Sequence, residues 1–197
     1  MADQPDGPKL TLPDLETAAL REAYANAEVI LEYGMGGSTV VAAKTPGHSV
    51  FSVESDPDWH SKMAHWFASN PPAATVRLHH ADIGPTGKWG HPADRKRLNL
   101  WSGYPISVWD RADFRHPDLV LVDGRFRLAC MLTTLLRIQR ATRILVDDYI
   151  DRPPYHAIET LVGAPTMIGR MADFQFTPQV LPVQHMRWIM AAYASPF

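Results

Sequence analysis

The segment from Val29 to Thr39 reads VILEYGMGGST, an apolar run that passes into a glycine turn and then into the start of a helix. Gly34 and Gly36 allow positive φ angles and a close approach of the backbone to a ligand. The helix start leaves N–H groups without intrahelical partners, and these can bind a polar ligand. A strand, a glycine turn and a helix in this order predict a nucleoside-binding α/β fold.

An acidic strand end follows 20 positions after Gly34. The apolar run SVFSV at 49–53 ends in Glu54, whose carboxylate can accept hydrogen bonds from both hydroxyls of a ribose. A dinucleotide fingerprint also requires a glycine at its sixth position, where this chain has Thr39. The pattern therefore predicts a nucleoside site and disfavours a nucleotide-dependent dehydrogenase.

Length and composition predict a single domain over residues 1–197, with 46% hydrophobic residues. A net charge of −2 gives no electrostatic footprint for nucleic acid or an anionic membrane, so we expect neither as a partner. The first residues lack a signal peptide and no apolar run reaches membrane-spanning length, which favours a cytoplasmic location. Cys130 lies in an apolar run and is expected in the core.

Strands and helices are expected to alternate along the chain. An N-terminal part, residues 1–28, comprises a frayed arm over 1–12 and a first helix from Pro13 to about Asn26 that could cover the cofactor mouth. The aliphatic run before Asp123 indicates a strand buried on both faces, as in a parallel sheet covered by helices. Strands are expected at about 29–33, 49–54, 75–80, 117–123 and 143–146.

Periodicity is lost between residues 84 and 116, an irregular insertion between the third and fourth strands. It contains Trp89, Trp101, Tyr104 and Trp109. Long loops in compact domains are usually functional, so the insertion could cover a substrate or bind a partner, including a second copy in a homodimer. The alternative is that its aromatic residues pack on the body of the protein.

Carboxylates follow two successive strands, as Asp123 and as the pair Asp147 and Asp148. If these strands are neighbours, the three groups repel one another unless they are protonated or bridged by a cation. Oxygen ligands select a hard ion such as Mg²⁺, Ca²⁺ or Mn²⁺. The alternative is that Asp147 caps the next segment and Asp148 is a solvated turn residue.

The turn Glu32-x-Gly34-x-Gly36-x-Ser38 resembles the first motif of the class I S-adenosylmethionine-dependent methyltransferases. In that family the acidic position orders the loop near the amino-acid part of the cofactor. The resemblance implies S-adenosylmethionine over this turn, with Glu54 on its ribose and a polar residue near its adenine. The cofactor-binding residues implied are Glu32, Gly34, Gly36, Gly37, Ser38, Glu54, Asp82 and Ile83.

The same resemblance, over about residues 29–193, implies a Rossmann-like, doubly wound, mostly parallel seven-stranded sheet with helices on both faces and an antiparallel last strand. The segments 173–176 and 186–193 suit its closing antiparallel pair. The cofactor and a small-molecule substrate are then the expected partners.

The acidic residues resemble those of metal-dependent O-methyltransferases, both the catechol type and the antibiotic-sugar type related to macrocin methyltransferase. This resemblance implies a divalent metal at Asp123, Asp147 and Asp148. It fails at one point, because catechol-type enzymes have a basic lysine three places after the first aspartate and this chain has Phe126. The base could be a metal-bound hydroxyl, a carboxylate of the three, or His156.

Two arginines flank Phe126, and their guanidinium groups stay protonated and cannot act as a base. Arg125 and Arg127 suit a carboxylate or phosphate on the substrate, or salt bridges with Asp148 or Asp151. The candidate catalytic residues are Asp123, Arg125 and His156. The predicted activity is methyl transfer to a hydroxyl of a small molecule such as a sugar. The alternative is an inactive cofactor-binding interaction module, which the missing lysine favours and the acidic residues oppose.

Overall fold

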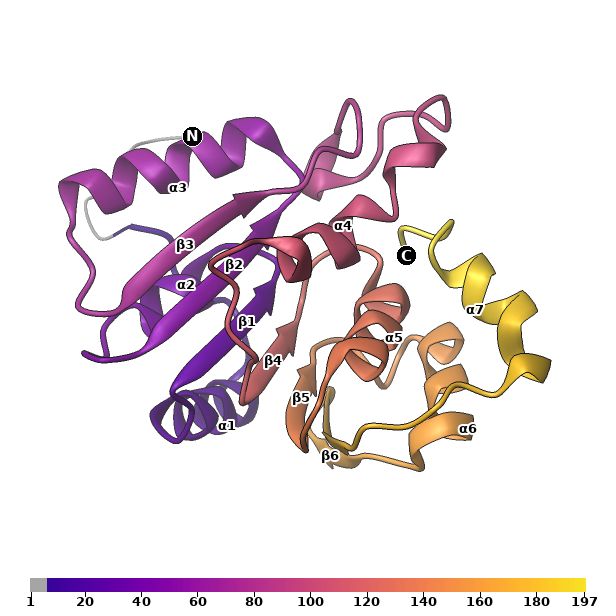
Figure 1. Cartoon of the computed structure of the whole chain (residues 1–197). Coiled ribbons are helices and arrows are strands. Elements are labelled where there is room, and N and C mark those ends of the chain that lie inside the picture. Colours follow the sequence, from indigo (N-terminus) through magenta and orange to yellow (C-terminus); the bar gives the residue numbers. More distant parts are fainter. Residues whose placement is uncertain (1–6) are drawn as a thin grey trace.

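Seven strands form one sheet in the computed structural model, which describes residues 7–197 (Figure 1). The strand order is β3-β2-β1-β4-β5-β7-β6, with β1 to β5 parallel and β7 antiparallel to both of its neighbours. The strands are β1 (Val29–Tyr33), β2 (Ser49–Glu54), β3 (Thr75–His80), β4 (Leu119–Val122), β5 (Thr142–Val146), β6 (Thr166–Ile168) and β7 (Met171–Phe176). The predicted fold class is confirmed.

The order of the strands places a topological switch between β1 and β4. From β1 the sheet continues to β2 and β3 on one side, and from β4 to β5 on the other. Pairing of Tyr33 with both Val53 and Val122 brings the carboxyl ends of β1, β2 and β4 level. Ligands of open α/β sheets bind at such a point, outside the carboxyl ends of the strands.

Helices cover both faces of the sheet (Figure 1). One face packs against α1, α2 and α3, and the opposite face against α4, α5 and α7. The helices are α1 (Asp14–Ala25), α2 (Gly37–Ala42), α3 (Pro57–Ser69), α4 (Gly103–Ile106), α5 (Arg127–Arg137), α6 (Glu159–Val162) and α7 (Met186–Ala192). Short 3-10 helices are η1 (Lys88–Gly90), η2 (Leu98–Leu100), η3 (Ser107–Asp110), η4 (Pro153–Ile158) and η5 (Val183–His185).

The expected closing strand over 186–193 is wrong, because this segment forms α7. The antiparallel pair consists instead of β6 and β7, joined by a tight turn at Gly169, whose φ is +57°. In α7, Ile189 and Ala192 are buried three positions apart, which is helical spacing. The apolar residues at 186–193 thus follow a helical period, and apolar content alone does not distinguish this from a strand.

The insertion packs most of its aromatic residues on the body of the protein. Trp101, Tyr104 and Trp109 are buried, whereas Trp89 is 77% exposed. Trp109 Nε1 donates to the Tyr33 hydroxyl at 2.7 Å, and that hydroxyl donates to the Pro105 carbonyl at 2.6 Å. The insertion is therefore anchored to the carboxyl end of β1.

The expected frayed arm lies partly outside the described residues, over 1–6. From residue 7 onwards the arm is packed: Gly7 lies against the Trp66 indole, and the backbone of Lys9 and Leu10 lies against Gly37. Among residues 7–197, no helix has the length and apolar character needed to cross a membrane.

Candidate functional site

Gly34 occupies the point where the ends of β1 and β4 touch. Its φ is +109°, and a Cβ at this position would lie 2.7 Å from the Gly124 nitrogen. Its own N–H donates to the Val53 carbonyl at 3.0 Å, which ties the turn to β2. Both the backbone angle and the space therefore require glycine at this position.

Gly36 and Gly37 lie next to each other but in different surroundings. Gly36 has extended backbone, and a Cβ there would meet no atom within 4 Å. A Cβ on Gly37 would instead collide with the backbone of Lys9 and Leu10. The open side of the turn is thus at Gly36, while the N-terminal arm covers Gly37.

Glu32 is completely buried beneath this turn. The Tyr24 hydroxyl donates to its Oε1 at 2.5 Å, and its Oε2 has no hydrogen-bond partner among the described residues. Burial raises the pKa of the Glu32 carboxyl, and the hydrogen bond from Tyr24 opposes this. Thr39 is also buried, and its Oγ1 accepts a hydrogen bond from the Gly36 N–H at 3.0 Å.

Glu54 ends β2 beside the same turn. It is half-buried, and its Oε1 accepts hydrogen bonds from the backbone of Ser55 at 2.7 Å and of Asp56 at 2.8 Å. Burial raises the pKa of the Glu54 carboxyl, while these two N–H groups lower it. The insertion reaches this residue through Gly90, whose carbonyl accepts a hydrogen bond from Ser55 Oγ at 2.9 Å.

Asp82 and Ile83 follow β3 and differ in exposure. Asp82 is exposed, and its Oδ1 accepts a hydrogen bond from the Gly84 N–H at 2.8 Å. Ile83 is 1% exposed, with its side chain in the core shared with α4 and α5. The Asp82 carboxylate is therefore accessible to a ligand, and the Ile83 side chain is not.

The three predicted acidic residues converge at the ends of β4 and β5. Carboxylate oxygens of Asp123, Asp147 and Asp148 lie within 4.8 Å of one another. The pairing of Val122 with Val146 brings the two strand ends level. Asp147 is buried, and Asp148 has a φ of +54°. Asp148 is a half-buried turn residue, and the three carboxylates form one cluster.

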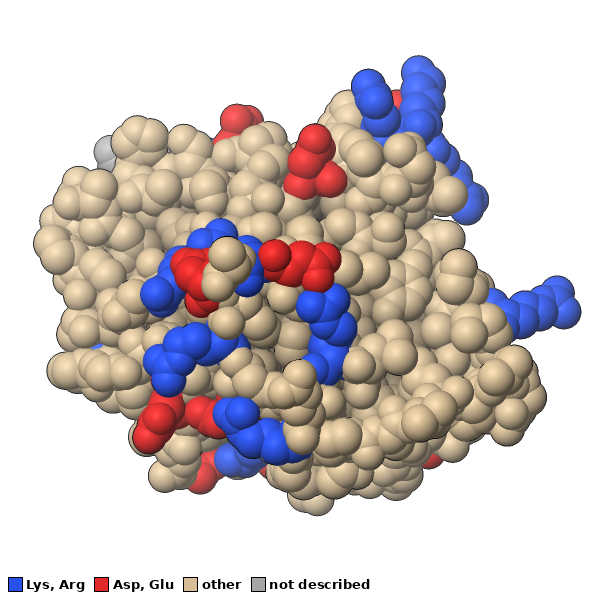
Figure 2. Space-filling view, in the orientation of Figure 1, with Lys and Arg blue, Asp and Glu red and all other residues tan. Residues whose placement is uncertain are grey.

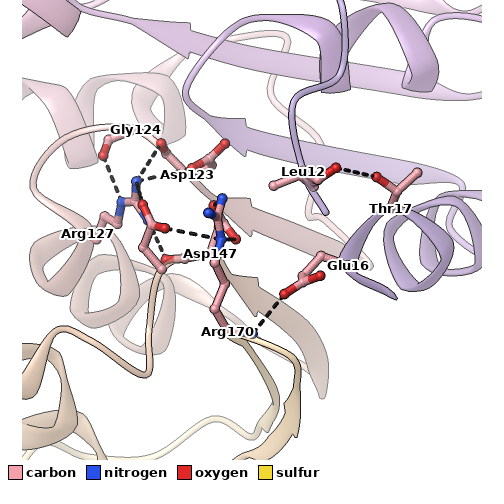
Figure 3. Close-up of polar contacts among 9 residues, drawn as sticks. Leu12, Glu16, Thr17, Asp123, Gly124, Arg127, Asp147 and Arg170 are labelled. Atoms are coloured by element: carbon pink, nitrogen blue, oxygen red, sulfur yellow. Dashed lines mark hydrogen bonds and ion pairs between the residues drawn. The ribbon is translucent and has the colours of Figure 1, made fainter. Parts of the chain in front are cut away.

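Arg127 holds the cluster together from α5 (Figure 3). It is buried, and its Nη2 lies 3.1 Å from Asp123 Oδ1 and 3.3 Å from Asp148 Oδ2. The same guanidinium donates to the main-chain carbonyls of Gly124 and Asp123, at 3.0 and 3.1 Å, and to that of Asp147. These contacts fix the cation in place. A salt bridge with Asp148 was one of the alternatives predicted for Arg127, beside one with Asp151 and the binding of a substrate anion.

Arg170 reaches the cluster from the turn between β6 and β7 (Figure 3). Its Nη2 and Nε lie 2.7 and 3.0 Å from the two carboxylate oxygens of Asp147, and its Nε lies 3.2 Å from Asp148 Oδ1. The Arg170 N–H donates to Oε1 of the buried Glu16 at 2.8 Å, so α1 helps to hold this turn.

Two guanidinium groups therefore bind the carboxylates that a divalent ion would need. Both oxygens of Asp147 are bound by Arg170, and Arg127 bridges Asp123 and Asp148. Three carboxylates and two guanidiniums leave a single net negative charge when all are ionised. A hard cation needs several free carboxylate oxygens, and here an arginine occupies each carboxylate. The residues as arranged do not fit a divalent metal.

The Asp123 carboxyl has a raised pKa. Burial raises its pKa to about 7, Arg127 opposes this, and the charges of Asp147 and Asp148 add to it. A carboxyl with this pKa can accept a proton near neutral pH.

The remaining predicted catalytic residues lie around the cluster without joining it. His156 Nε2 is 3.0 Å from the Tyr149 carbonyl, and its ring packs on the Tyr149 ring. Arg125 is half-buried and its guanidinium makes no hydrogen bond or ion pair within residues 7–197. Phe126 is buried against Trp101 and Tyr104. The position of the missing lysine is therefore part of the core.

Sequence reasoning missed Arg170 and Tyr24. Arg170 lies 22 positions after Asp148, in a turn for which no strand pairing was predicted. Tyr24 was assigned to the first helix, but nothing in its spacing linked its hydroxyl to Glu32. Both contacts depend on the tertiary arrangement of α1 and the β6–β7 turn.

Two open cavities among the described residues lie away from the glycine turn. One is lined by Arg143, Val162 and Gln175 at the β7 edge, and the other lies between α2 and α3 beside Trp66. At the turn itself the Tyr104 hydroxyl contacts Gly124.

Comparison with solved structures places this fold among methyltransferases. A methyltransferase-like protein from Silicibacter pomeroyi is 50% identical over 96% of this chain and 99% of its own, with a TM-score of 0.92. The O-methyltransferase TomG from Streptomyces achromogenes, in complex with S-adenosylmethionine, is 16% identical over 86% of this chain and 82% of its own, with a TM-score of 0.58. An RNA methyltransferase from Salinibacter ruber, in complex with S-adenosylhomocysteine, is 16% identical over 88% of this chain and 97% of its own, with a TM-score of 0.51.

The chain belongs to a family of methyltransferase-like proteins, as its similarity to the protein from Silicibacter pomeroyi shows, and its fold is that of S-adenosylmethionine-dependent methyltransferases. The two structures at 16% identity share the fold alone. No protein-family model matches the sequence, and no curated protein matches it.

Proposed function

We propose that this protein transfers a methyl group from S-adenosylmethionine to a hydroxyl oxygen of a small molecule, with sugars among the candidate acceptors. The observation that carries the proposal is the position of Asp123. This carboxyl has a pKa of about 7 and follows β4, next to the turn at Gly34. A base with such a pKa suits removal of a proton from a hydroxyl.

The residues of the glycine turn fit S-adenosylmethionine. A Cβ on Gly36 would meet no atom within 4 Å, so this side of the turn is open. One carboxylate oxygen of the buried Glu32 has no hydrogen-bond partner among the described residues. Glu54 and Asp82 supply carboxylates for the ribose and the adenine amino group. When bound, the cofactor supplies a methyl group attached to a positively charged sulfur.

The protein's own residues would then align the acceptor and take up its proton. The acceptor oxygen forms the bond to the methyl carbon, the bond from carbon to sulfur breaks, and the hydroxyl proton passes to Asp123. Alignment of the reacting atoms and exclusion of water would supply most of the rate. Because Arg127 and Arg170 already offset most of the negative charge of the acidic cluster, we propose that a divalent metal is not required.

Release of S-adenosylhomocysteine from S-adenosylmethionine, measured by mass spectrometry over a panel of hydroxylated acceptors, tests this function. We expect turnover with at least one acceptor, and loss of turnover without loss of cofactor binding in Asp123→Asn. Turnover by Asp123→Asn at the wild-type rate would contradict the role of Asp123.

The second candidate is an inactive cofactor-binding interaction module. It is favoured by the buried Phe126 at the position where catechol-type enzymes have a lysine. Cofactor binding without turnover on any acceptor, amine and thiol acceptors included, would support the module over the enzyme.

A further inference from the structure

Arg125 stands apart from the other arginines of the chain. The buried or half-buried arginines are Arg77, Arg111, Arg125, Arg127, Arg143 and Arg170. All of them except Arg125 form an ion pair with an aspartate within the described residues. The arginines without a polar side-chain contact elsewhere in residues 7–197 are exposed to solvent, as Arg187 is. Arg125 alone combines partial burial with an unpaired guanidinium.

Its surroundings do not supply the missing negative charge. Burial lowers the pKa of the Arg125 guanidinium, and the nearby charge of Arg127 lowers it further. Asp123, two residues away, is already bound by Arg127. Removing a cation from water without a partner costs free energy. A bound anion would offset this cost at Arg125.

Residues from three parts of the chain meet around Arg125. The Tyr104 hydroxyl accepts a hydrogen bond from the Arg125 N–H at 3.4 Å, and burial, together with the charge of Arg125, lowers the pKa of His91. The Phe197 ring packs on the His91 ring with centroids 4.9 Å apart, and the Pro196 carbonyl accepts a hydrogen bond from the Phe126 N–H at 3.3 Å. Arg125 thus lies near the insertion and the C-terminal residues, and its guanidinium forms no ion pair within residues 7–197.

We propose that Arg125 binds an oxyanion, a carboxylate or a phosphate, carried by the methyl acceptor. The inference rests on the proposed function, because it assigns the anion to the acceptor of that reaction. A guanidinium binds either group through two parallel hydrogen bonds, which fixes the orientation of the acceptor as well as its affinity. Arg127, which is fully engaged with the acidic cluster, is not available for this task.

Further cations could attract such an acceptor. Figure 2 shows Lys and Arg side chains gathered at the upper right, where Figure 1 draws the segment between β3 and α4. The exposed cations of this segment are Lys88, Arg95, Lys96 and Arg97. The same segment carries His91, the residue that Arg125 influences. A group of like charges raises the local concentration of an oppositely charged ligand.

The test is a titration of the S-adenosylhomocysteine-saturated full chain with benzoate, with inorganic phosphate and with uncharged benzyl alcohol. The signal is the Nε–Hε resonance of Arg125 in protein labelled with ¹⁵N-arginine, assigned by its loss in Arg125→Gln. We expect benzoate, phosphate or both to shift this resonance, and benzyl alcohol to leave it unchanged. Arg187→Gln, which removes an exposed arginine of α7, is the matched control.

Comparison of benzoate with phosphate identifies which kind of anion Arg125 binds. A shift with benzoate alone supports a carboxylate acceptor, and a shift with phosphate alone supports a phosphorylated acceptor. No shift with either anion, or equal shifts with benzyl alcohol, would overturn the proposal. Circular dichroism of Arg125→Gln and its melting temperature show whether the variant folds.

A second measurement separates this inference from the proposed function. For a transferable acceptor, turnover is compared between 3-hydroxybenzoate and 3-hydroxybenzyl alcohol, and between a sugar phosphate and the free sugar. In Arg125→Gln we expect KM for the anionic member to rise at least about tenfold, with little change for the neutral member. Equal loss for both members would contradict anion recognition. If no acceptor turns over, the proposed function fails, and the shift of the Arg125 resonance still decides whether the site binds anions.

Discussion

The two halves of the carboxyl edge of the sheet differ in whether their carboxylates are paired with arginines. On the β1–β2 side, an open glycine turn lies beside the single carboxylates of Glu32 and Glu54, which no arginine neutralises among the described residues. On the β4–β5 side, three carboxylates are packed with two arginines. The first half keeps hydrogen-bonding capacity for a ligand, while the second satisfies most of its own.

The features of one side arise from residues close together in the sequence, whereas those of the other depend on tertiary contacts. The features of the β1–β2 side come from short segments in which a strand end, a turn and a helix start follow one another. The β4–β5 side is completed by Arg170, held in place by Glu16 of α1, so its charge balance depends on residues distant in sequence. An acidic cluster is therefore not evidence of a metal until the cations around it are known.

The largest expected effect comes from removing the buried cation of the β4–β5 side. Arg127→Met leaves Asp123 without its cation, removes one of the two cations on Asp148, and leaves three main-chain carbonyls without this donor. Breaking a buried ion pair in this way typically lowers the free energy of unfolding by about 3–5 kcal/mol. Urea denaturation measures the loss. Arg170→Met, at a half-exposed arginine, is expected to lose less, and equal losses would contradict the central position of Arg127.

A matched pair of variants tests the β1–β2 side. Gly34→Ala places a Cβ 2.7 Å from the Gly124 nitrogen at a φ of +109°, so it should destabilise the fold by roughly 1–3 kcal/mol. Gly36→Leu adds a side chain where no atom lies within 4 Å, so stability should hold while S-adenosylhomocysteine binding weakens. Denaturation and calorimetry give the two quantities. Unchanged cofactor binding in Gly36→Leu would show that the open side of the turn is not the cofactor surface.

His79 of β3 should make the stability of the fold depend on pH. Burial, helped by the charge of Arg111, lowers the pKa of His79 from 6.5 to about 4, and its Nε2 lies 2.7 Å from Ser107 Oγ. The unfolded chain binds this proton more readily, so this contribution to stability is present above about pH 6.5 and is lost as the pH falls toward 4. The expected loss is roughly 1–2 kcal/mol after allowance for partial exposure.

Chemical denaturation across this pH range, compared between wild type and His79→Gln, checks the effect. The variant should show a flatter dependence of stability on pH, with other titrating groups contributing equally to both proteins. Identical slopes would mean that His79 does not carry the effect.

The smallest expected effect is the response of the β4–β5 side to metal. Because arginines already occupy the acidic cluster, millimolar Mg²⁺ or Mn²⁺ should change the melting temperature by less than about 1 °C, and EDTA should leave it unchanged. Asp147→Asn serves as the control that weakens any metal site. A clear stabilisation of the wild type that Asp147→Asn removes would reverse our interpretation of the cluster.

Features that depend on residues close together in the sequence were predicted correctly. Strands β1, β2 and β3 follow the predicted ranges because hydrophobic runs there are bounded by glycine, proline and acidic residues. The convergence of Asp123 with Asp147 also followed from the expectation of neighbouring parallel strands. In contrast, α7 was mistaken for a strand because its apolar residues satisfy both periods over a short span.

Other features could not be predicted because they depend on contacts between distant segments. Nothing near Arg170 in the sequence indicates that it reaches Asp147, and nothing near Lys9 indicates that the arm covers Gly37. The aromatic residues of the insertion allowed either a binding surface or a packed core, and the burial of Trp101 and Trp109 supports packing for these two.

Binding of S-adenosylhomocysteine, measured by calorimetry in EDTA and again in Mg²⁺, most directly tests the account that the glycine turn holds the cofactor while arginines replace a metal. We expect micromolar affinity that is the same in both buffers and is lost in Gly36→Leu. Absence of binding in both buffers, or binding only with Mg²⁺, would contradict it.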